Sequence, residues 1–242
     1  MKAIRVHEFG GPEVLKLEEV ATPKPSASEV LVRIHAAGVN PYDTYMRAGT
    51  YTVKPPLPYT PGSDGAGVVE AVGEGVKRVK RDDRVYIARN LTGAYAEYVL
   101  AREEEIHPLP GKIDFKQAAG VWVSYGTAYH ALHHWAKARA SETALVHGAS
   151  GGVGIAALQI AHAMGLRVLG TAGTPKGLEL AKQEGAHQVF DHRKSGYQDE
   201  ILHATGNRGV DIILEMLANM NLSHDTKLLA NNGRDLAGRS GL

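Results

Sequence analysis

The pattern of apolar and polar positions changes near the middle of the chain. The first half has short stretches of alternating apolar and polar residues separated by glycine and proline, which is typical of β-strands joined by turns. In the second half, apolar runs alternate with segments whose apolar residues recur every three or four positions, which predicts strands alternating with helices. We therefore expect a β-rich domain over residues 1–122 and an α/β domain over 123–242, with the boundary near 120–124.

The expected elements can be assigned to residue ranges. The strand-like segments of the first half are 2–6, 30–36, 67–72, 84–88 and 94–100. In the second half the expected strands are 143–147, 167–171, 188–190 and 211–215, and the expected helices are 114–119, 125–136, 153–164, 176–184 and 198–204. A common dinucleotide-binding sheet has six parallel strands. Only four are convincing here, because Asp235 and several small or charged residues interrupt the segment that should form a fifth, buried strand.

Net charge, cysteine content and the length of the apolar stretches exclude several classes of protein. The formal net charge is +1 without a long run of one sign, which argues against a dedicated nucleic-acid binder. The chain has no cysteine, which excludes disulfides, thiolate nucleophiles and zinc sites built on sulfur. No apolar stretch approaches the ~18 residues of a membrane helix, and no leader pattern begins the chain. We expect a cytoplasmic protein that does not enter a membrane.

The strongest chemical signal is a glycine-rich turn between an apolar strand and an amphipathic helix. It reads LVHGASGGVG over residues 145–154, with glycines at Gly148, Gly151 and Gly154. Such glycines allow a tight turn, close approach of a pyrophosphate, and close packing of the helix on the sheet. The unpaired amides of Gly152 and Val153 would then face the anion at the positive end of the helix. The alternative is a structural turn in an unrelated α/β fold.

The end of the next strand bears on the choice of cofactor. An NAD-selective site normally has an acidic residue there to hold the ribose hydroxyls. Residues 170–176 read GTAGTPK, without a carboxylate that would repel a 2′-phosphate, and Lys176 could pair with that phosphate. The alternative for Lys176 is an exposed lysine in the first turn of a helix. The pattern favours NADP over NAD.

Several segments together resemble one family. The runs GVNPYDTYMRAGTY at 38–51 and PYTPGSDGAGV at 58–68 accompany the turn at 146–154, GTAGT at 170–174, FDHR at 190–193 and EMLAN at 215–219. The combination resembles the zinc-free quinone oxidoreductases of the zeta-crystallin type, within the medium-chain dehydrogenase/reductase family, over positions 1 to about 234. The resemblance implies a GroES-like catalytic domain over 1–122. It also implies a Rossmann dinucleotide-binding domain over 123–242, incomplete at its C-terminus in a truncated chain.

The resemblance also implies a chemistry without metal. Zinc-dependent relatives have a cysteine near Asn40 and a histidine after the equivalent of Gly62, whereas Pro41, Tyr42 and Ser63 stand here. Without a metal to polarise a carbonyl, the acceptor must already be electron-poor, as a quinone is. The implied activity is NADPH-dependent quinone reduction. The alternatives are a 2-enoyl or alkenal reductase, and a non-catalytic NADPH- and RNA-binding, crystallin-like protein.

Site residues follow from the same resemblance. Asn40 and Tyr45 are the implied catalytic residues, with Tyr45 also on the nicotinamide side of the cofactor, although Tyr45 could equally be a packing residue. The other implied cofactor contacts are Ser150, Gly151, Gly152, Val153, Gly173, Lys176, His192 and Asn221. No metal ligand is implied. The implied partners are a small-molecule quinone, messenger RNA and, as in relatives, further copies of the chain in a homotetramer, although the shortened chain puts that assembly in doubt.

Overall fold

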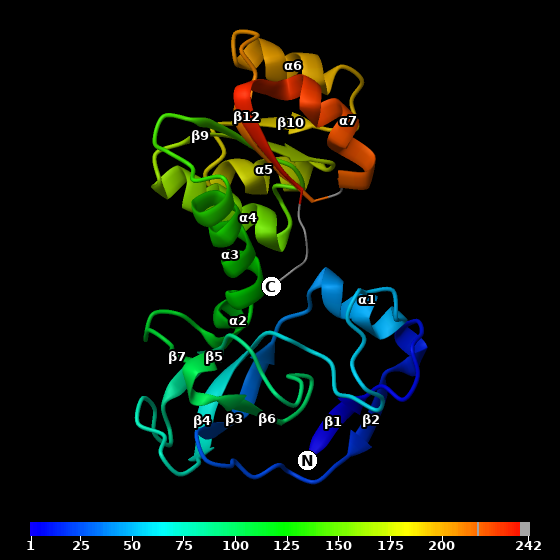
Figure 1. Cartoon of the computed structure of the whole chain (residues 1–242), viewed down its shortest axis with the longest axis vertical. Helices are drawn as coiled ribbons and strands as arrows, with labels where there is room; N and C mark the ends of the chain where they lie inside the picture. The colour runs from blue at the N-terminus through cyan, green and yellow to red at the C-terminus, as the bar shows by residue number, and fades with distance from the viewer. Residues whose placement is uncertain (217, 238–242) are drawn as a thin grey trace. The chain divides into compact units, whose positions relative to one another are not determined.

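The computed structural model contains two compact units (Figure 1). It describes residues 1–216 and 218–237, of which 218–220 and 237 are described by their backbone alone. The first unit is Met1–Val123 and the second is Ser124–Leu242. The division falls one residue beyond the end of the first domain expected from the sequence. Within the described residues, no helix has the length and apolar character that crossing a bilayer requires.

The first unit is built on antiparallel strands. Strands β1 (Lys2–Arg5) and β2 (Lys16–Glu19) form a two-stranded sheet. A five-stranded sheet has the order β6-β3-β4-β5-β7, with β3 at Glu29–Ala37, β4 at Gly65–Val72, β5 at Arg84–Ile87, β6 at Tyr98–Arg102 and β7 at Ile106–Pro108. Helices α1 (Pro41–Ala48) and α2 (Phe115–Ala118) and the 3-10 turns Pro12–Val14 and Glu103–Glu105 complete the unit. Alternate strand residues such as Val30 and Val32 enter its core, as the period of two predicts.

The second unit alternates strands with helices. Its parallel sheet has the order β10-β9-β8-β11-β12, in which the first strand along the chain, β8, is central. The strands are β8 (Thr143–Val146), β9 (Arg167–Ala172), β10 (Gln188–Asp191), β11 (Val210–Glu215) and β12 (Leu229–Ala237). The helices are α3 (Trp122–Tyr129), a π-helical continuation at His130–Trp135, α4 (Gly152–Ala163), α5 (Pro175–Gln183), α6 (Tyr197–Ala204) and α7 (Ala218–Leu228). These strands and helices confirm the Rossmann-type domain, and the antiparallel sheet confirms its GroES-like neighbour.

Helices cover both faces of the parallel sheet (Figure 1). Helices α3, α4 and α5 pack on one face through buried residues that include Ala128, Leu158 and Ala181. Helices α6 and α7 cover the other face through Ile201 and Leu228. The helical stripe expected in the segment 153–164 is confirmed, since its apolar members are buried or packed against the same core. Both faces of the sheet therefore bury apolar residues, as parallel sheets usually do.

The expectation that Asp235 breaks the fifth strand is wrong. Strand β12 pairs in parallel with β11, with Asp235 opposite Ile213 and Leu236 opposite Leu214. Leu236 packs against the core of the unit, and Arg234 forms a 2.8 Å ion pair with Glu142. Backbone pairing and these neighbours therefore hold the strand in place although one of its side chains is acidic. Neither carboxylate oxygen of Asp235 is exposed, and neither has a hydrogen-bond partner within the part of the chain that the structure describes.

The unpartnered carboxylate of Asp235 yields a test of strand stability. We expect Asp235→Val to raise the free energy of unfolding by roughly 1–3 kcal/mol, because it removes a buried acceptor without a donor and adds a β-branched side chain to a strand. Chemical denaturation measures the change. Asp235→Asn is the matched control and should stabilise less, since it removes the charge but keeps a polar side chain. A lower stability for the valine variant would contradict the argument.

Candidate functional site

The glycine-rich turn follows β8 and leads directly into α4. Gly148 has a φ of +58°, in the left-handed region that favours glycine. A Cβ atom at Gly154 would lie 2.3 Å from the carbonyl oxygen of Gly148 and 2.7 Å from Cα of Ala149. Both distances are shorter than atomic contact allows, so α4 can pack this closely on the turn only because Gly154 has no side chain.

The first turn of α4 leaves two amides open to a ligand. Within the described residues, no backbone carbonyl or side chain accepts a hydrogen bond from the N–H groups of Gly152 and Val153. Gly151 is exposed, and its own amide donates to the carbonyl oxygen of Gly148 at 2.9 Å. These open amides stand at the positive end of a 12-residue helix, which is the arrangement that binds phosphate.

The expected adenosine end of the site comes together around α5. A Cβ atom at Gly173 would lie 2.6 Å from Nε2 of His192, so these two predicted residues are in contact. Ser150 lies beside the start of α5, since its Oγ would be 2.9 Å from a Cβ atom at Gly177. Lys176 is exposed in the first turn of α5. The structure thus brings Ser150 close to α5 and Gly173 close to His192, as a cofactor site in this unit requires.

Asn221 has a different environment from the other predicted contacts. It lies on α7, and its Nδ2 donates to Oε2 of Glu215 at 3.0 Å. Glu215 is 1% exposed and also lies 3.7 Å from Nε2 of His147. Asn221 is therefore tied to a buried acidic group that the sequence analysis did not identify. His147 is distant from Glu215 in the sequence, and only the tertiary fold brings the two side chains together. A local sequence pattern therefore could not reveal this group.

In the first unit, Asn40 joins two buried carboxylates. Its backbone N–H donates to Oδ2 of Asp43 at 2.9 Å, and its Nδ2 donates to Oδ2 of Asp64 at 3.0 Å. Ser63 Oγ donates to Oδ1 of Asp43 at 2.9 Å, and the amide of Val123 donates to Oδ1 of Asp64 at 3.2 Å. The side chain of Asn40 is 8% exposed and is held by these contacts.

Burial dominates the electrostatics of this network. It raises the pKa of Asp64 to about 6 although Asn40 and Val123 donate to the carboxylate. Burial also raises the pKa of Asp43, and it raises the pKa values of the nearby Tyr42 and Tyr95 hydroxyls with a further contribution from the charge of Asp43. The network therefore holds acidic groups whose charge the unit stabilises poorly.

Tyr45 differs from Asn40 in its exposure. It lies on α1, and 49% of the residue is exposed. A packing residue of the core would be buried, so the exposure favours the alternative in which the ring is available to a ligand. Nothing in the structure tests a catalytic role for Tyr45 or Asn40, which stays a prediction. The expectation that no zinc is held near Pro41, Tyr42 and Ser63 is also untested.

The pKa of Asp64 predicts how the stability of the protein depends on pH. Because the folded pKa lies above the usual value, this group favours the folded state below about pH 4, and the contribution is lost as the pH rises through about 6. Between pH 7 and pH 5 it should add about 1 kcal/mol to the free energy of unfolding. Asp64→Asn should remove that gain, which urea denaturation at the two pH values measures.

The control for this pH dependence is Asp82→Asn, at an exposed position. Its stability should change between pH 7 and pH 5 as that of the unmodified chain does. Equal pH dependence in the Asp64→Asn variant and the unmodified chain would show that Asp64 titrates alike in the folded and unfolded states.

Two family models match the chain. One is described as alcohol dehydrogenase GroES-like domain and matches residues 26–111, and the other is described as zinc-binding dehydrogenase and matches residues 152–236. The second match lies outside the positions near Asn40 and Ser63 at which zinc ligands stand in relatives. The two models correspond to the two units of the fold.

Curated relatives with the name quinone oxidoreductase match nearly the whole chain. The protein from Homo sapiens is 56% identical over 235 residues, which cover 97% of this chain and 71% of that protein. The protein from Pseudomonas aeruginosa is 41% identical over 215 residues, covering 88% of this chain and 66% of that protein.

Solved structures agree with the sequence comparison. The structure of Escherichia coli quinone oxidoreductase complexed with NADPH matches with a TM-score of 0.91 and 34% identity, over 98% of this chain and 72% of that chain. A structure of CurK enoyl reductase matches with a TM-score of 0.91 and 27% identity, over 100% of this chain and 75% of that chain. The length, identity and fold of these matches show that the chain belongs to the quinone oxidoreductase family.

Proposed function

We propose that the protein is an NADPH-dependent quinone reductase. The balanced reaction converts NADPH, a proton and a quinone into NADP⁺ and a hydroquinone. The observation that carries the proposal is the pair of open amides at Gly152 and Val153, placed after a glycine turn at the start of α4. A pyrophosphate is the ligand that such amides fit best. Identity of 56% to a quinone oxidoreductase supports the choice of substrate.

The cofactor residues have distinct proposed roles. We propose that the amides of Gly152 and Val153 bind the pyrophosphate, with Ser150 and Gly151 lining its approach. Gly173, Lys176 and His192 form the end that holds the 2′-phosphate, since Gly173 and His192 are in contact and Lys176 is an exposed cation nearby in sequence. Asn221 contacts the cofactor ribose from α7. When bound, the cofactor supplies the reducing equivalents, and the protein orients it and excludes side reactions.

Residues of the first unit supply the proposed substrate contacts. We propose that Tyr45 donates a hydrogen bond from its hydroxyl to a quinone oxygen and that Asn40 positions the start of α1. The hydrogen bonds from Asn40 to Asp43 and Asp64 fix that helix end, which supports the positioning role. Messenger RNA binding and assembly into a tetramer stay predictions from the resemblance.

The match to an enoyl reductase favours 2-enoyl reduction as a second candidate. The fold similarity is as high as for the quinone oxidoreductase, but the sequence identity is 27% rather than the 56% to the human protein. Quinone reduction is therefore the preferred proposal. Parallel assays of NADPH oxidation with an ortho-quinone and with a 2-alkenal separate the two. Binding of NADPH without oxidation in either assay would contradict the proposed activity.

Lys176 provides a test of cofactor choice. We expect Lys176→Ala to raise the Kd for NADPH by roughly five- to tenfold while leaving the Kd for NADH unchanged, because only NADPH has the 2′-phosphate that pairs with an ammonium group. Quenching of intrinsic fluorescence measures both constants.

Lys182→Ala is the matched control for this test, since Lys182 is an exposed lysine in the last turn of the same helix. It should leave both constants unchanged. Equal weakening of NADPH and NADH by the Lys176 variant would mean that Lys176 does not contact the 2′-phosphate.

A further inference from the structure

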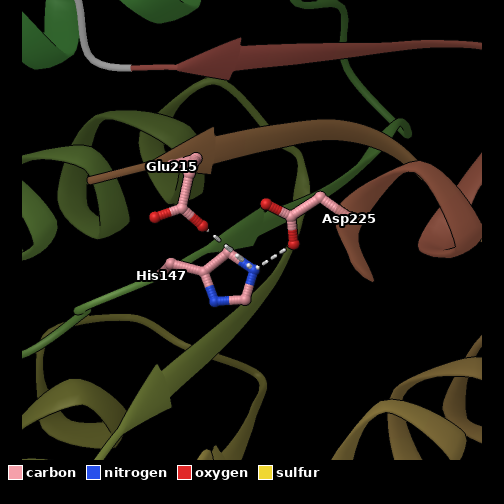
Figure 2. A group of neighbouring side chains, drawn as sticks. All are labelled: His147, Glu215 and Asp225. Atoms are coloured by element: carbon pink, nitrogen blue, oxygen red, sulfur yellow. Dashed lines mark hydrogen bonds and ion pairs between the residues drawn. The ribbon is translucent and has the colours of Figure 1, made fainter. Parts of the chain in front are cut away.

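A buried group of one histidine and two carboxylates lies on the face of the parallel sheet that α6 and α7 cover. His147 follows β8, Glu215 ends β11, and Asp225 comes from α7. Figure 2 shows both carboxylates, which come from different elements, facing the same nitrogen of the imidazole, Nε2. His147 is 3% exposed, and Glu215 and Asp225 are each 1% exposed. The cofactor roles proposed above do not use these three side chains.

The distances within the group suit coordination of one ion. Nε2 of His147 lies 3.0 Å from Oδ1 of Asp225 and 3.7 Å from Oε2 of Glu215. One ligand atom from each residue lies within 4.8 Å of the other two. Ligands at ~2.1 Å from a zinc ion, in a tetrahedral arrangement, are about 3.4 Å apart, between the two measured values. Small side-chain rotations would therefore place all three atoms around one centre.

Acidic side chains outnumber basic ones among the described residues of this group. Asp235 on β12 adds a third acidic side chain that interacts with His147, Glu215 and Asp225. Oδ2 of Asp225 is fully buried and has no hydrogen-bond partner among the described residues, and the same holds for both carboxylate oxygens of Asp235. Buried carboxylates are ordinarily paired or bound to a metal. A divalent cation would give the buried Oδ2 of Asp225 a partner.

The second nitrogen of the imidazole is held as it is in many metal sites. Nδ1 of His147 lies 3.1 Å from Oγ1 of Thr171. Metal-bound histidines usually form such a hydrogen bond on the nitrogen that does not bind the metal, because it fixes the ring and its tautomer. Nε2 faces the carboxylates and lies 3.0 Å from Oδ1 of Asp225, so a metal ion would displace the proton that these two atoms share.

We propose that His147, Glu215 and Asp225 bind a divalent transition-metal ion. One imidazole nitrogen and two carboxylate oxygens form a donor set suited to Zn²⁺ or Co²⁺. The ion would join the ends of β8 and β11 to α7, so its role is structural. Binding would be coupled to folding, since the ligands come from segments far apart in the sequence.

A second group of histidines must be removed before the site can be tested. His130 and His134 lie four residues apart on the π-helical segment, with ring centroids 4.8 Å apart. Two imidazoles at this spacing on a helix can chelate a transition metal at the surface. The experiment therefore uses the full chain with His130→Ala and His134→Ala as its background. In this background any tight binding must come from elsewhere.

The test is a titration of the metal-depleted background chain with CoCl₂ and ZnCl₂. We expect one ion per chain by equilibrium dialysis, a visible d–d absorption band for Co²⁺, and a higher Tm with Zn²⁺. Asp225→Asn should weaken binding by more than tenfold, and Thr171→Val by ~10-fold or more through the lost support of the imidazole. Asp211→Asn is the matched control. It lies on β11, its carboxylate is paired with Arg208 at 2.8 Å, and its change should leave the affinity for the metal as it was.

Two outcomes would overturn the proposal. One is the absence of any bound ion at 100 µM metal in the background chain, which would make the group a set of hydrogen bonds around the imidazole. The other is binding whose affinity Asp225→Asn and Thr171→Val both leave unchanged. Circular dichroism establishes that each variant is folded, and Thr171→Val, which removes no charge, decides the matter if Asp225→Asn does not fold. None of these readouts depends on NADPH or on turnover.

Discussion

The close contact between α4 and the turn before it is the constraint on which the proposed cofactor site depends. The backbone of Gly148 and Ala149 occupies the space that a side chain at Gly154 would need. A larger residue would push the first turn of α4 away from the sheet and redirect the amides of Gly152 and Val153. A steric requirement at one position thus determines where the helix presents its positive end.

Each unit buries acidic side chains, and the two units compensate for them differently. In the first unit, Asp64 receives hydrogen bonds from an amide side chain and a backbone amide, which offset part of the cost of burial. In the second, Oδ1 of Asp225 faces one imidazole, and none of the described residues donates a hydrogen bond to its Oδ2. Two neutral donors thus satisfy the carboxylate of Asp64, whereas one oxygen of Asp225 is buried without such a donor.

The local sequence pattern correctly predicted the elements that have a strong apolar periodicity or a glycine-rich turn. Helices α4 and α5 and the glycine turn were predicted closely, because their signals lie within a few consecutive residues. The strands β2 and β7 were missed, since four and three residues give little periodicity, and the helix α1 was also missed. The hydrogen bonds between Asn40 and Asp64 and between His147 and Asp225 span 24 and 78 residues. No local signal records such pairs, so only the fold reveals them.

Strand β12 shows why a rule about side chains can be wrong about a strand. An acidic residue makes a buried strand less stable, but it leaves intact the backbone donors and acceptors that pair with β11. Leu236 and the ion pair of Arg234 with Glu142 stabilise the same segment. The cost of Asp235 therefore remains local, as a carboxyl whose pKa burial and the neighbouring charges of Asp225 and Glu215 raise to about 6. Asp235 thus changes the electrostatics around its side chain, while the pairing of β12 with β11 and the topology of the sheet stay the same.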